Sequence, residues 1–297
     1  MKYALYLGCA IPIKYPGFEA ATRLTCERLG IELADMPFSC CPPPTSMKMV
    51  HYDSWLALAA RNLCLAEEAG LDLLTLCSGC VNTLKEANHI LKHSESKRRR
   101  VNKILSGHNH HFKGTIEVTH ILDVLYQDSI VEQLIKKTVR EIPIRVGCHY
   151  GCHYFRPPHI MYPHELSEAE SYVPVNMDHL LSIIGVEPAE YSRKFLCCGS
   201  PMSANLEPEV GYTIVAEKLM HINDRNIQAL SVICPACFEQ FDMGQIQLSR
   251  KNKDMKKVPT FFVTQLIGLA LGMSPVEVGV DVHRIKAKKL LKDINIA

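Results

Sequence analysis

The sequence has no apolar run long enough to cross a membrane and no recognisable signal peptide. A membrane span needs about 18 consecutive apolar residues, and the best candidate, residues 261–273, is too short and is expected to form a core helix. Residues 1–9 carry one charge and then a short apolar run that ends at Cys9, with no cleavage site. We therefore expect a cytoplasmic protein whose thiols are reduced or bound to metal.

The chain also carries little net charge. Its formal net charge of +2 at pH 7 gives no reason to expect a polyanionic partner such as nucleic acid. Hydrophobic residues make up 47% of the sequence and charged residues 22%, which is a globular composition and not a disordered one. At 297 residues, the chain is long enough for two domains, each with its own core.

Cysteine is abundant, and its spacing repeats. The chain has 13 cysteines, and two of its motifs are adjacent pairs, Cys40-Cys41 and Cys197-Cys198. A Cys-x-x-Cys motif follows each pair after 35 residues, at Cys77 and Cys80 in the first half and at Cys234 and Cys237 in the second. An upstream cysteine completes each set: Cys9 in the first half, and Cys148 or Cys152 in the second. The chain is thus predicted to contain two copies of one five-cysteine module.

The apolar pattern predicts an α/β fold with two pseudo-symmetric parallel-sheet (βαβ) domains, residues 1–142 and 143–297, the second with extra C-terminal helices. Short apolar runs predict strands at 2–7, 31–36, 71–76, 144–146 and 229–233, and the order strand, helix, strand, helix, strand is expected in each half. Helical spacing predicts helices at 19–29, 54–69, 81–105, 178–184, 210–227, 261–271 and 286–292, with a helix pair over 118–138. The repeated cysteines follow strands, and ligands of parallel sheets bind at the carboxyl ends of strands.

Five cysteines in a module favour an iron–sulfur cluster over zinc. Structural zinc takes four ligands in a tetrahedron, and a simple cubane cluster is also held by four thiolates. Adjacent cysteines cannot easily bind one metal atom without strain, whereas they can reach two neighbouring irons or bridge them. Zinc and a disulfide or thiol relay remain as the less favoured alternatives.

Three cysteines need separate interpretation. Cys26 and Cys64 have no counterpart in the other half and have apolar neighbours, so we expect both to be buried small hydrophobic side chains. Cys148 and Cys152 both remain candidates for the second module. Cys152 leaves 44 residues before Cys197, against 48 from Cys148, and is closer to the 30 residues of the first module.

The tandem pattern Cys9…Cys40-Cys41…Cys77-x-x-Cys80 and Cys152…Cys197-Cys198…Cys234-x-x-Cys237 resembles the cysteine-rich (CCG) domain pair in the B subunit of heterodisulfide reductase. The resemblance covers nearly the whole chain. Tyr6-Leu7-Gly8-Cys9 and His149-Tyr150-Gly151-Cys152-His153 also look like the lead-in sequences of that family, which favours Cys152 over Cys148.

The resemblance implies that each module holds a noncubane [4Fe-4S] cluster. It further implies that the substrate is the mixed disulfide of coenzyme M and coenzyme B, the last electron acceptor of methanogenesis, reduced between the two clusters. The implied partners are the small iron–sulfur C subunit of heterodisulfide reductase, its flavin-bearing, electron-bifurcating A subunit, and a hydrogenase or formate dehydrogenase as the electron donor.

An anionic substrate requires fixed cations in its pocket. Lys14 follows Cys9, Lys48 follows the first cysteine pair, and Arg156 follows Cys152, so all three are candidates, although each is equally compatible with a solvated loop. His153 is a candidate proton donor to a leaving thiolate, with a structural hydrogen bond as the alternative.

Two other functions compete with disulfide reduction. The same cysteine-rich module occurs in electron-transfer subunits of lactate, glycolate and glycerol-3-phosphate dehydrogenases and of thiol–fumarate reductase, where this chain would act as a relay. The third hypothesis is a scaffold without activity whose fold is stabilised by bound zinc. A metal assay that identifies zinc or iron would separate this hypothesis from the other two.

Overall fold

A computed structural model describes residues 1–42, 47–162, 173–205, 207–253 and 255–296, and the chain folds into two compact units. Each unit is assembled from separate stretches of the sequence. Unit 1 contains Met1–Ile13, Gly30–Val124 and His153–Val173, and unit 2 contains Lys14–Leu29, Leu125–Cys152 and Pro174–Ala297.

The sheet of unit 1 has four parallel strands in the order β2-β1-β3-β4. Its strands are β1 (Lys2–Tyr6), β2 (Glu32–Asp35), β3 (Leu73–Thr75) and β4 (Val118–His120). Every residue of β3 is buried, as expected for a central strand of a parallel sheet covered on both faces.

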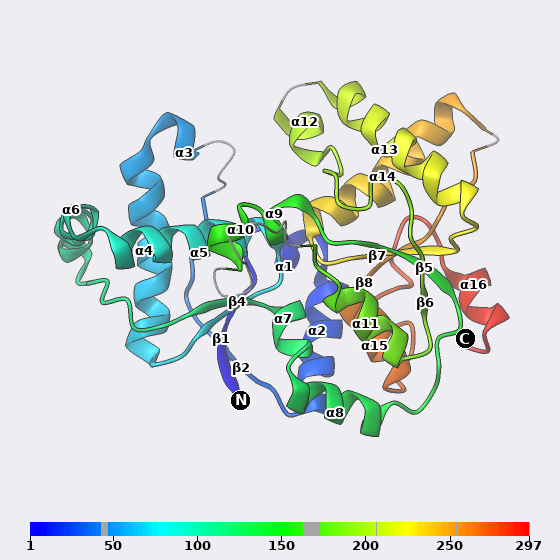
Figure 1. Ribbon diagram of the computed structural model, residues 1–297, viewed down its shortest axis with the longest axis horizontal. Helices are drawn as coiled ribbons and strands as arrows, with labels where there is room; N and C mark the ends of the chain where they lie inside the picture. Colours follow the sequence, from blue (N-terminus) through cyan, green and yellow to red (C-terminus); the bar gives the residue numbers. More distant parts are fainter. Residues whose placement is uncertain (43–46, 163–172, 206, 254, 297) are drawn as a thin grey trace. The chain divides into compact units, whose positions relative to one another are not determined.

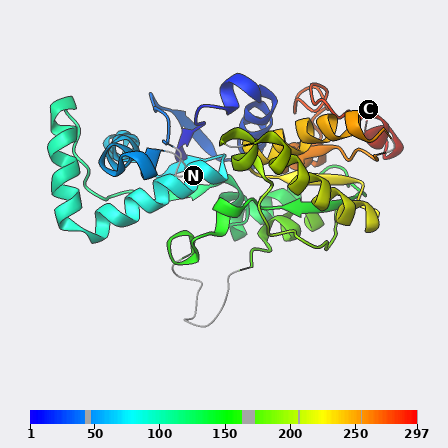
Figure 2. The same cartoon turned by 90° about the horizontal axis from the view of Figure 1, so that it is seen from above.

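The helices of unit 1 pack around α5, which contacts α4, α6, α10 and strand β4 (Figure 1). Helices α5 and α6 are separated by Ser94, whose extended backbone turns the chain, as Figure 2 shows. The helices are α3 (Met47–Val50), α4 (Tyr52–Ala69), α5 (Ser78–His93), α6 (Glu95–Leu105), the 3₁₀ turn η1 (Ser106–His108) and α10 (Pro158–Met161). At points where the chain passes from one unit to the other lie α1 (Ile11–Lys14), α7 (Ile121–Leu125) and α9 (Cys152–Phe155).

The sheet of unit 2 repeats the topology of the first, with four parallel strands in the order β6-β5-β7-β8. Its strands are β5 (Arg145–His149), β6 (Glu187–Pro188), β7 (Ala229–Val232) and β8 (Thr260–Phe262). All of β7 is buried, so β7 corresponds to β3 in burial as well as in position.

Two groups of helices belong to unit 2 (Figure 1). One group packs together and consists of α2 (Pro16–Leu29), α8 (Asp128–Lys137), α11 (Asn176–Ile183) and α15 (Val263–Ala270). The other consists of α12 (Ser200–Asn205), α13 (Pro208–Asp224) and α14 (Pro235–Lys251), and α16 (Lys288–Asp293) ends the chain.

Helix α2 is joined to unit 2 by specific contacts. The ring of Phe18 stacks on that of Phe262 with centroids 3.8 Å apart, and the hydroxyls of Thr22 and Thr264 are 3.2 Å apart. The helix therefore lies in unit 2 although it follows the first strand of unit 1 in sequence. A domain boundary between residues 142 and 143 stays a prediction.

The predicted α/β class with two parallel sheets is confirmed, but each sheet has one strand more than expected. Residues 118–120 form β4 and not the start of a helix pair, and residues 260–262 form β8 directly before α15. The predicted helix over 81–105 is two helices, because Ser94 leaves the helical conformation.

Within the described part of the chain, none of the helices combines the length and the hydropathy needed to span a lipid bilayer.

Candidate functional site

In unit 1, the five repeated cysteines meet at the carboxyl ends of the strands. Cys9 follows β1 after a turn at Gly8, Cys40 and Cys41 follow β2, and Cys77 and Cys80 lie between β3 and α5. Gly8 has a φ of 69°, and a β-carbon there would lie 3.0 Å from the sulfur of Cys80, so this turn requires glycine.

The five thiols of unit 1, named here the first cysteine set, form a continuous series of contacts. The thiol of Cys40 is hydrogen-bonded to those of Cys9 and Cys41. The Sγ atoms of Cys41 and Cys80 are 3.3 Å apart, and the thiol of Cys80 is also hydrogen-bonded to that of Cys77. The order of contact is thus Cys9, Cys40, Cys41, Cys80 and Cys77.

The second cysteine set, in unit 2, repeats this order position by position. Cys197 contacts Cys152 and Cys198, and Cys237 contacts Cys198 and Cys234. The order of contact is Cys152, Cys197, Cys198, Cys237 and Cys234. Each of these cysteines is the repeat counterpart of the cysteine at the same place in the first set. The two sets are therefore two copies of one arrangement of sulfur atoms.

Each set includes the first turn of a long helix. Cys77 is the N-cap of α5 with Cys80 in its first turn, and Cys234 and Cys237 occupy the same positions in α14. The unpaired N–H groups and the dipole at a helix N-terminus stabilise negative charge, whereas hydrogen bonds with the neighbouring thiols and burial raise the pKa of Cys80 and Cys237.

Within each set, one thiol of the adjacent pair is the most acidic. Hydrogen bonds from Cys40 and Cys80 lower the pKa of Cys41 to about 4. Hydrogen bonds from Cys152 and Cys198 lower the pKa of Cys197 to about 2. Each set thus gathers negative charge at the adjacent pair, which is the charge that a metal cluster neutralises.

Asn62 on α4 holds the first cysteine pair in place. Its Oδ1 accepts a hydrogen bond from the backbone N–H of Ser39 at 2.8 Å, and its Nδ2 donates to the carbonyl of Cys40 at 3.3 Å. The phenol of Tyr6 donates to the carbonyl of Ser39 at 2.6 Å. Asn62 and Tyr6 are fully buried, so side chains of the core hold the segment that carries Cys40 and Cys41 in place by hydrogen bonds.

Unit 2 has two buried lysines, Lys194 and Lys218, in the region of the second set. Lys218 on α13 is fully buried and donates a hydrogen bond to the carbonyl of Arg193. Lys194 is 4% exposed and pairs with Asp178 and Glu190, both at 2.6 Å. Burial lowers the pKa of Lys218 to about 8, while the thiolates of Cys237 and Cys198 act in the opposite direction. The second set therefore has a buried positive charge beside it.

The geometry favours Cys152 over Cys148 as the fifth member of the second set. Cys152 contacts Cys197 directly. Cys148 is buried within β5, and its thiol contacts the carboxylate of Asp178. Burial is the larger cause of the raised pKa of Cys148, and the negative charge of Asp178 is the second. Alternation along β5 explains the difference, because Cys148 faces the opposite side of the sheet from His149.

Cys26 on α2 and Cys64 on α4 lie outside both sets. Both side chains are fully inaccessible, and burial raises the pKa of each thiol to about 12. A buried neutral thiol behaves as a small hydrophobic group.

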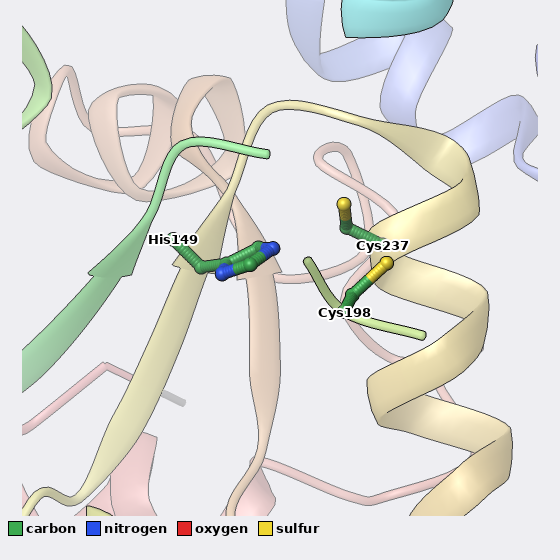
Figure 3. Close-up of side chains that lie close together, drawn as sticks. All are labelled: His149, Cys198 and Cys237. Atoms are coloured by element: carbon green, nitrogen blue, oxygen red, sulfur yellow. The ribbon is translucent and has the colours of Figure 1, made fainter. Parts of the chain in front are cut away.

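The sequence prediction missed one residue at the second set, His149. It is the last residue of β5, and its imidazole lies with the sulfurs of Cys198 and Cys237 such that all ligand atoms are within 4.8 Å of one another (Figure 3). Burial and then the charge of Lys218 lower the pKa of His149 to about 3, so the imidazole is neutral. The signal that could have revealed it is the register of the repeat, which aligns His149 with Tyr6.

The predicted substrate-binding residues lie in different surroundings. Lys14 belongs to unit 2 and pairs with Glu239 at 2.8 Å, and Lys48 belongs to unit 1 and pairs with Glu86 at 2.5 Å. Arg156 belongs to unit 1, and its guanidinium lies 4.8 Å from the centroid of the Phe155 ring. Among the described residues, no carboxylate forms an ion pair with Arg156. His153 is half-buried on α9.

The donor atoms present fit iron–sulfur clusters. All 13 cysteines are free thiols, and ten of them form two sets of five touching sulfurs at equivalent strand ends. Five thiolates with one adjacent pair exceed the four ligands of tetrahedral zinc. Each set therefore provides the soft sulfur ligands of an iron–sulfur cluster with one thiolate beyond the four of a cubane.

Comparisons with known proteins agree with this arrangement. A family described as "Cysteine-rich domain" (CCG) matches residues 3–85 and 146–242. The chain is 34% identical over 295 residues to the B subunit of the ferredoxin/F(420)H(2)-dependent CoB-CoM heterodisulfide reductase from Methanosarcina acetivorans, covering 99% of this chain and 97% of that one. It is 28% identical over 296 residues to the 8-methylmenaquinol:fumarate reductase membrane anchor subunit of Wolinella succinogenes, covering 97% and 99% of the two chains.

Among solved structures, a hypothetical protein from Helicobacter pylori has the same fold, with a TM-score of 0.73 at 18% identity. The match covers 96% of this chain and 52% of that one. The repeated domains, the repeated cysteine sets and the full-length similarity agree, and the chain belongs to the cysteine-rich (CCG) domain family as a relative of the heterodisulfide reductase B subunit.

Proposed function

We propose that this protein is the catalytic subunit of a heterodisulfide reductase, which reduces the mixed disulfide of coenzyme M and coenzyme B to two thiols. The observation that carries the proposal is the pair of equivalent five-cysteine sets, each at the carboxyl ends of a parallel sheet. Full-length similarity to the B subunit of a heterodisulfide reductase supports the choice of substrate.

The duplication suits the electron count of the reaction. Reduction of one disulfide consumes two electrons and two protons, breaks the S–S bond and yields two thiols. Each bound noncubane [4Fe-4S] cluster would supply one electron. The ten cysteines of the two sets would hold the clusters, and the buried residues behind them, Asn62 in unit 1 and Lys218 in unit 2, would keep the sulfur ligands in position.

Arg156 is the best candidate for binding the anionic substrate. Asn82, which follows Cys80 by two residues on α5, donates a hydrogen bond to the carbonyl of Arg156 at 2.7 Å. This bond anchors Arg156 beside helix α5, which has Cys77 as its N-cap and Cys80 in its first turn. Its guanidinium is not neutralised by a described carboxylate, whereas Lys14 and Lys48 already pair with glutamates. His153, three residues before Arg156, is the proposed proton donor.

The proposed partners follow from the same assignment. Electrons would arrive through the small iron–sulfur C subunit of the reductase together with its flavin-bearing A subunit, with a hydrogenase or a formate dehydrogenase as the ultimate donor. The protein would then work within a larger complex and not alone.

The test is an anaerobic assay with a chemically reduced viologen dye as electron donor and the coenzyme M–coenzyme B disulfide as acceptor. We expect dye oxidation that depends on the disulfide, with two thiols formed for each disulfide consumed. Arg156→Ala should raise KM for the disulfide about tenfold, because a charge-assisted contact to an anion contributes about 1.5 kcal/mol or more.

Arg99→Ala is the matched control. Arg99 is an exposed arginine of unit 1 that pairs with Glu95 on α6, away from the first cysteine set. Its replacement should leave KM unchanged. An Arg156→Ala protein with unaltered KM would remove Arg156 from the substrate site.

The second candidate is an electron relay, which the similarity to a fumarate reductase subunit favours. A relay would hold the same clusters but would pass no electrons from them to a disulfide. Loaded clusters together with no disulfide-dependent dye oxidation would therefore select the relay over the reductase.

A further inference from the structure

His149 lies beside two cysteines of the second cysteine set, Cys198 and Cys237, and is not itself a member of the set. Its side chain is fully buried, and neither ring nitrogen forms a hydrogen bond of ordinary geometry with any described residue. The ring is held edge to face against Phe241, with centroids 5.0 Å apart. A buried imidazole without a partner costs free energy, so a ligand that satisfies it is expected at this position.

The ring faces the place where a cluster would be bound. His149 ends β5, Cys198 precedes α12 and Cys237 lies in the first turn of α14, and the three side chains lie close together in Figure 3. The backbone of Lys194 is near enough to raise the pKa of His149, but it forms no hydrogen bond of ordinary geometry with the ring. The sulfurs of Cys198 and Cys237 are thus the polar atoms toward which the imidazole is directed.

The first cysteine set has a different residue at this position. The strands β1 and β5 have equal length, and each ends three residues before the first cysteine of its set, so Tyr6 corresponds to His149. Tyr6 likewise lies beside Cys41 and Cys80, the counterparts of Cys198 and Cys237. The phenol of Tyr6 contacts the thiol of Cys41, but its single proton is donated to the carbonyl of Ser39 at 2.6 Å. The two sets therefore differ in one buried donor.

We infer that His149 donates a ring N–H hydrogen bond to a sulfur of the second cluster, and that this bond makes the second cluster easier to reduce than the first. The inference rests on the proposed function only for the presence of the clusters. His149 is a positioning and tuning residue in this scheme, and the five thiols remain the ligands.

The physical basis is the charge of the reduced cluster. A hydrogen bond to a cluster sulfur withdraws electron density and stabilises the more negative, reduced state, which raises the reduction potential. The ammonium of Lys218 acts in the same direction, because it is buried beside Cys198 and Cys237.

The experiment compares His149→Phe, which keeps a flat ring without an N–H, with His149→Gln, which keeps a donor. Tyr6→Phe is the matched control, since it alters the equivalent residue of the first set. Iron and sulfide are counted first, and an anaerobic redox titration followed by EPR then gives the potentials of both clusters.

We expect His149→Phe to retain both clusters and to make one potential more negative while the other stays unchanged. A tenfold change in the reduction equilibrium corresponds to about 59 mV for a one-electron couple, and a shift of this order is expected. His149→Gln should recover most of the shift. Tyr6→Phe should leave the potential that responds to His149 unchanged. Two unchanged potentials in His149→Phe would overturn the inference.

A second measurement does not depend on whether the variant assembles. In the unmutated protein with ¹⁵N-labelled histidine, electron–nuclear double resonance should detect an exchangeable deuteron and a weak coupling to a histidine nitrogen. Strong nitrogen coupling would mean that His149 is an iron ligand, and no coupling would mean no contact; either result overturns the inference. Zinc without sulfide would instead refute the proposed function.

Discussion

Replacement of Asn62 by alanine should release the first cysteine pair from α4. Asn62 makes two hydrogen bonds to the backbone of the segment before Cys41, one with the N–H of Ser39 at 2.8 Å and one with the carbonyl of Cys40 at 3.3 Å. At about 1 kcal/mol for each bond, Asn62→Ala should lower the free energy of unfolding of unit 1 by about 2 kcal/mol. The larger effect is on geometry, because Cys40 and Cys41 would no longer be held beside Cys80.

The assay is iron content after anaerobic purification, with denaturant unfolding measured in parallel. Unaltered protein should hold about eight irons, four in each cluster, and Asn62→Ala should hold about four. Asn88→Ala is the matched control, since Asn88 is also buried in unit 1 but donates to the carbonyl of Ile116 at 3.1 Å. The control should lose about 1 kcal/mol of stability, for its one hydrogen bond, and keep its iron.

Full iron content in Asn62→Ala would refute the claim that Asn62 positions the cysteine pair. Loss of iron from both clusters, or equal loss in Asn88→Ala, would show that iron content follows general stability and not the position of Cys40 and Cys41.

Two further predictions concern unit 2. Gly199→Ala should destabilise the fold by about 2 kcal/mol and remove iron from the second cysteine set only. The reason is that Gly199 has a φ of 88° and that a β-carbon there would lie 2.7 Å from the carbonyl oxygen of Gly211. Iron content measures the effect, and a variant that retains eight irons would contradict the prediction. Burial lowers the pKa of His283 from 6.5 to about 4. Between pH 6.5 and about pH 4, His283 is therefore protonated in the unfolded chain but neutral in the native chain. The free energy of unfolding falls as the pH is lowered through this range, by about 2 kcal/mol at pH 5. His283→Leu should lack this loss when unfolding at pH 5 and pH 7 is compared, and an unchanged pH dependence would refute the assignment.

The cysteine spacing was sufficient to predict where the candidate site lies. Motifs such as Cys77-x-x-Cys80 follow continuous apolar runs, and such runs form buried strands of parallel sheets. Since the carboxyl ends of those strands share one edge, the cysteines that follow them meet there. This argument needs only local sequence and the general topology of parallel sheets.

The missed features depend on tertiary contacts. Strands β4 and β8 have three residues each and stand directly before helices, so they show no periodicity of their own. The apolar face of α2 predicts burial but does not identify Phe262 and Thr264 as its neighbours. The lead-in sequences that begin at Tyr6 and His149 distinguish Cys152 from Cys148, but they do not show that the imidazole of His149 lies beside Cys198 and Cys237, because that depends on tertiary contacts.

The most direct test of the central claim is the metal and acid-labile sulfide content of the anaerobically purified protein, followed by EPR after oxidation in the presence of coenzyme M thiol. Two clusters at the two cysteine sets predict about eight irons with matching sulfide in each chain, and a thiol-induced cluster signal. Zinc without sulfide, or about eight irons that remain after serine replacement of Cys197 and Cys198, would contradict it.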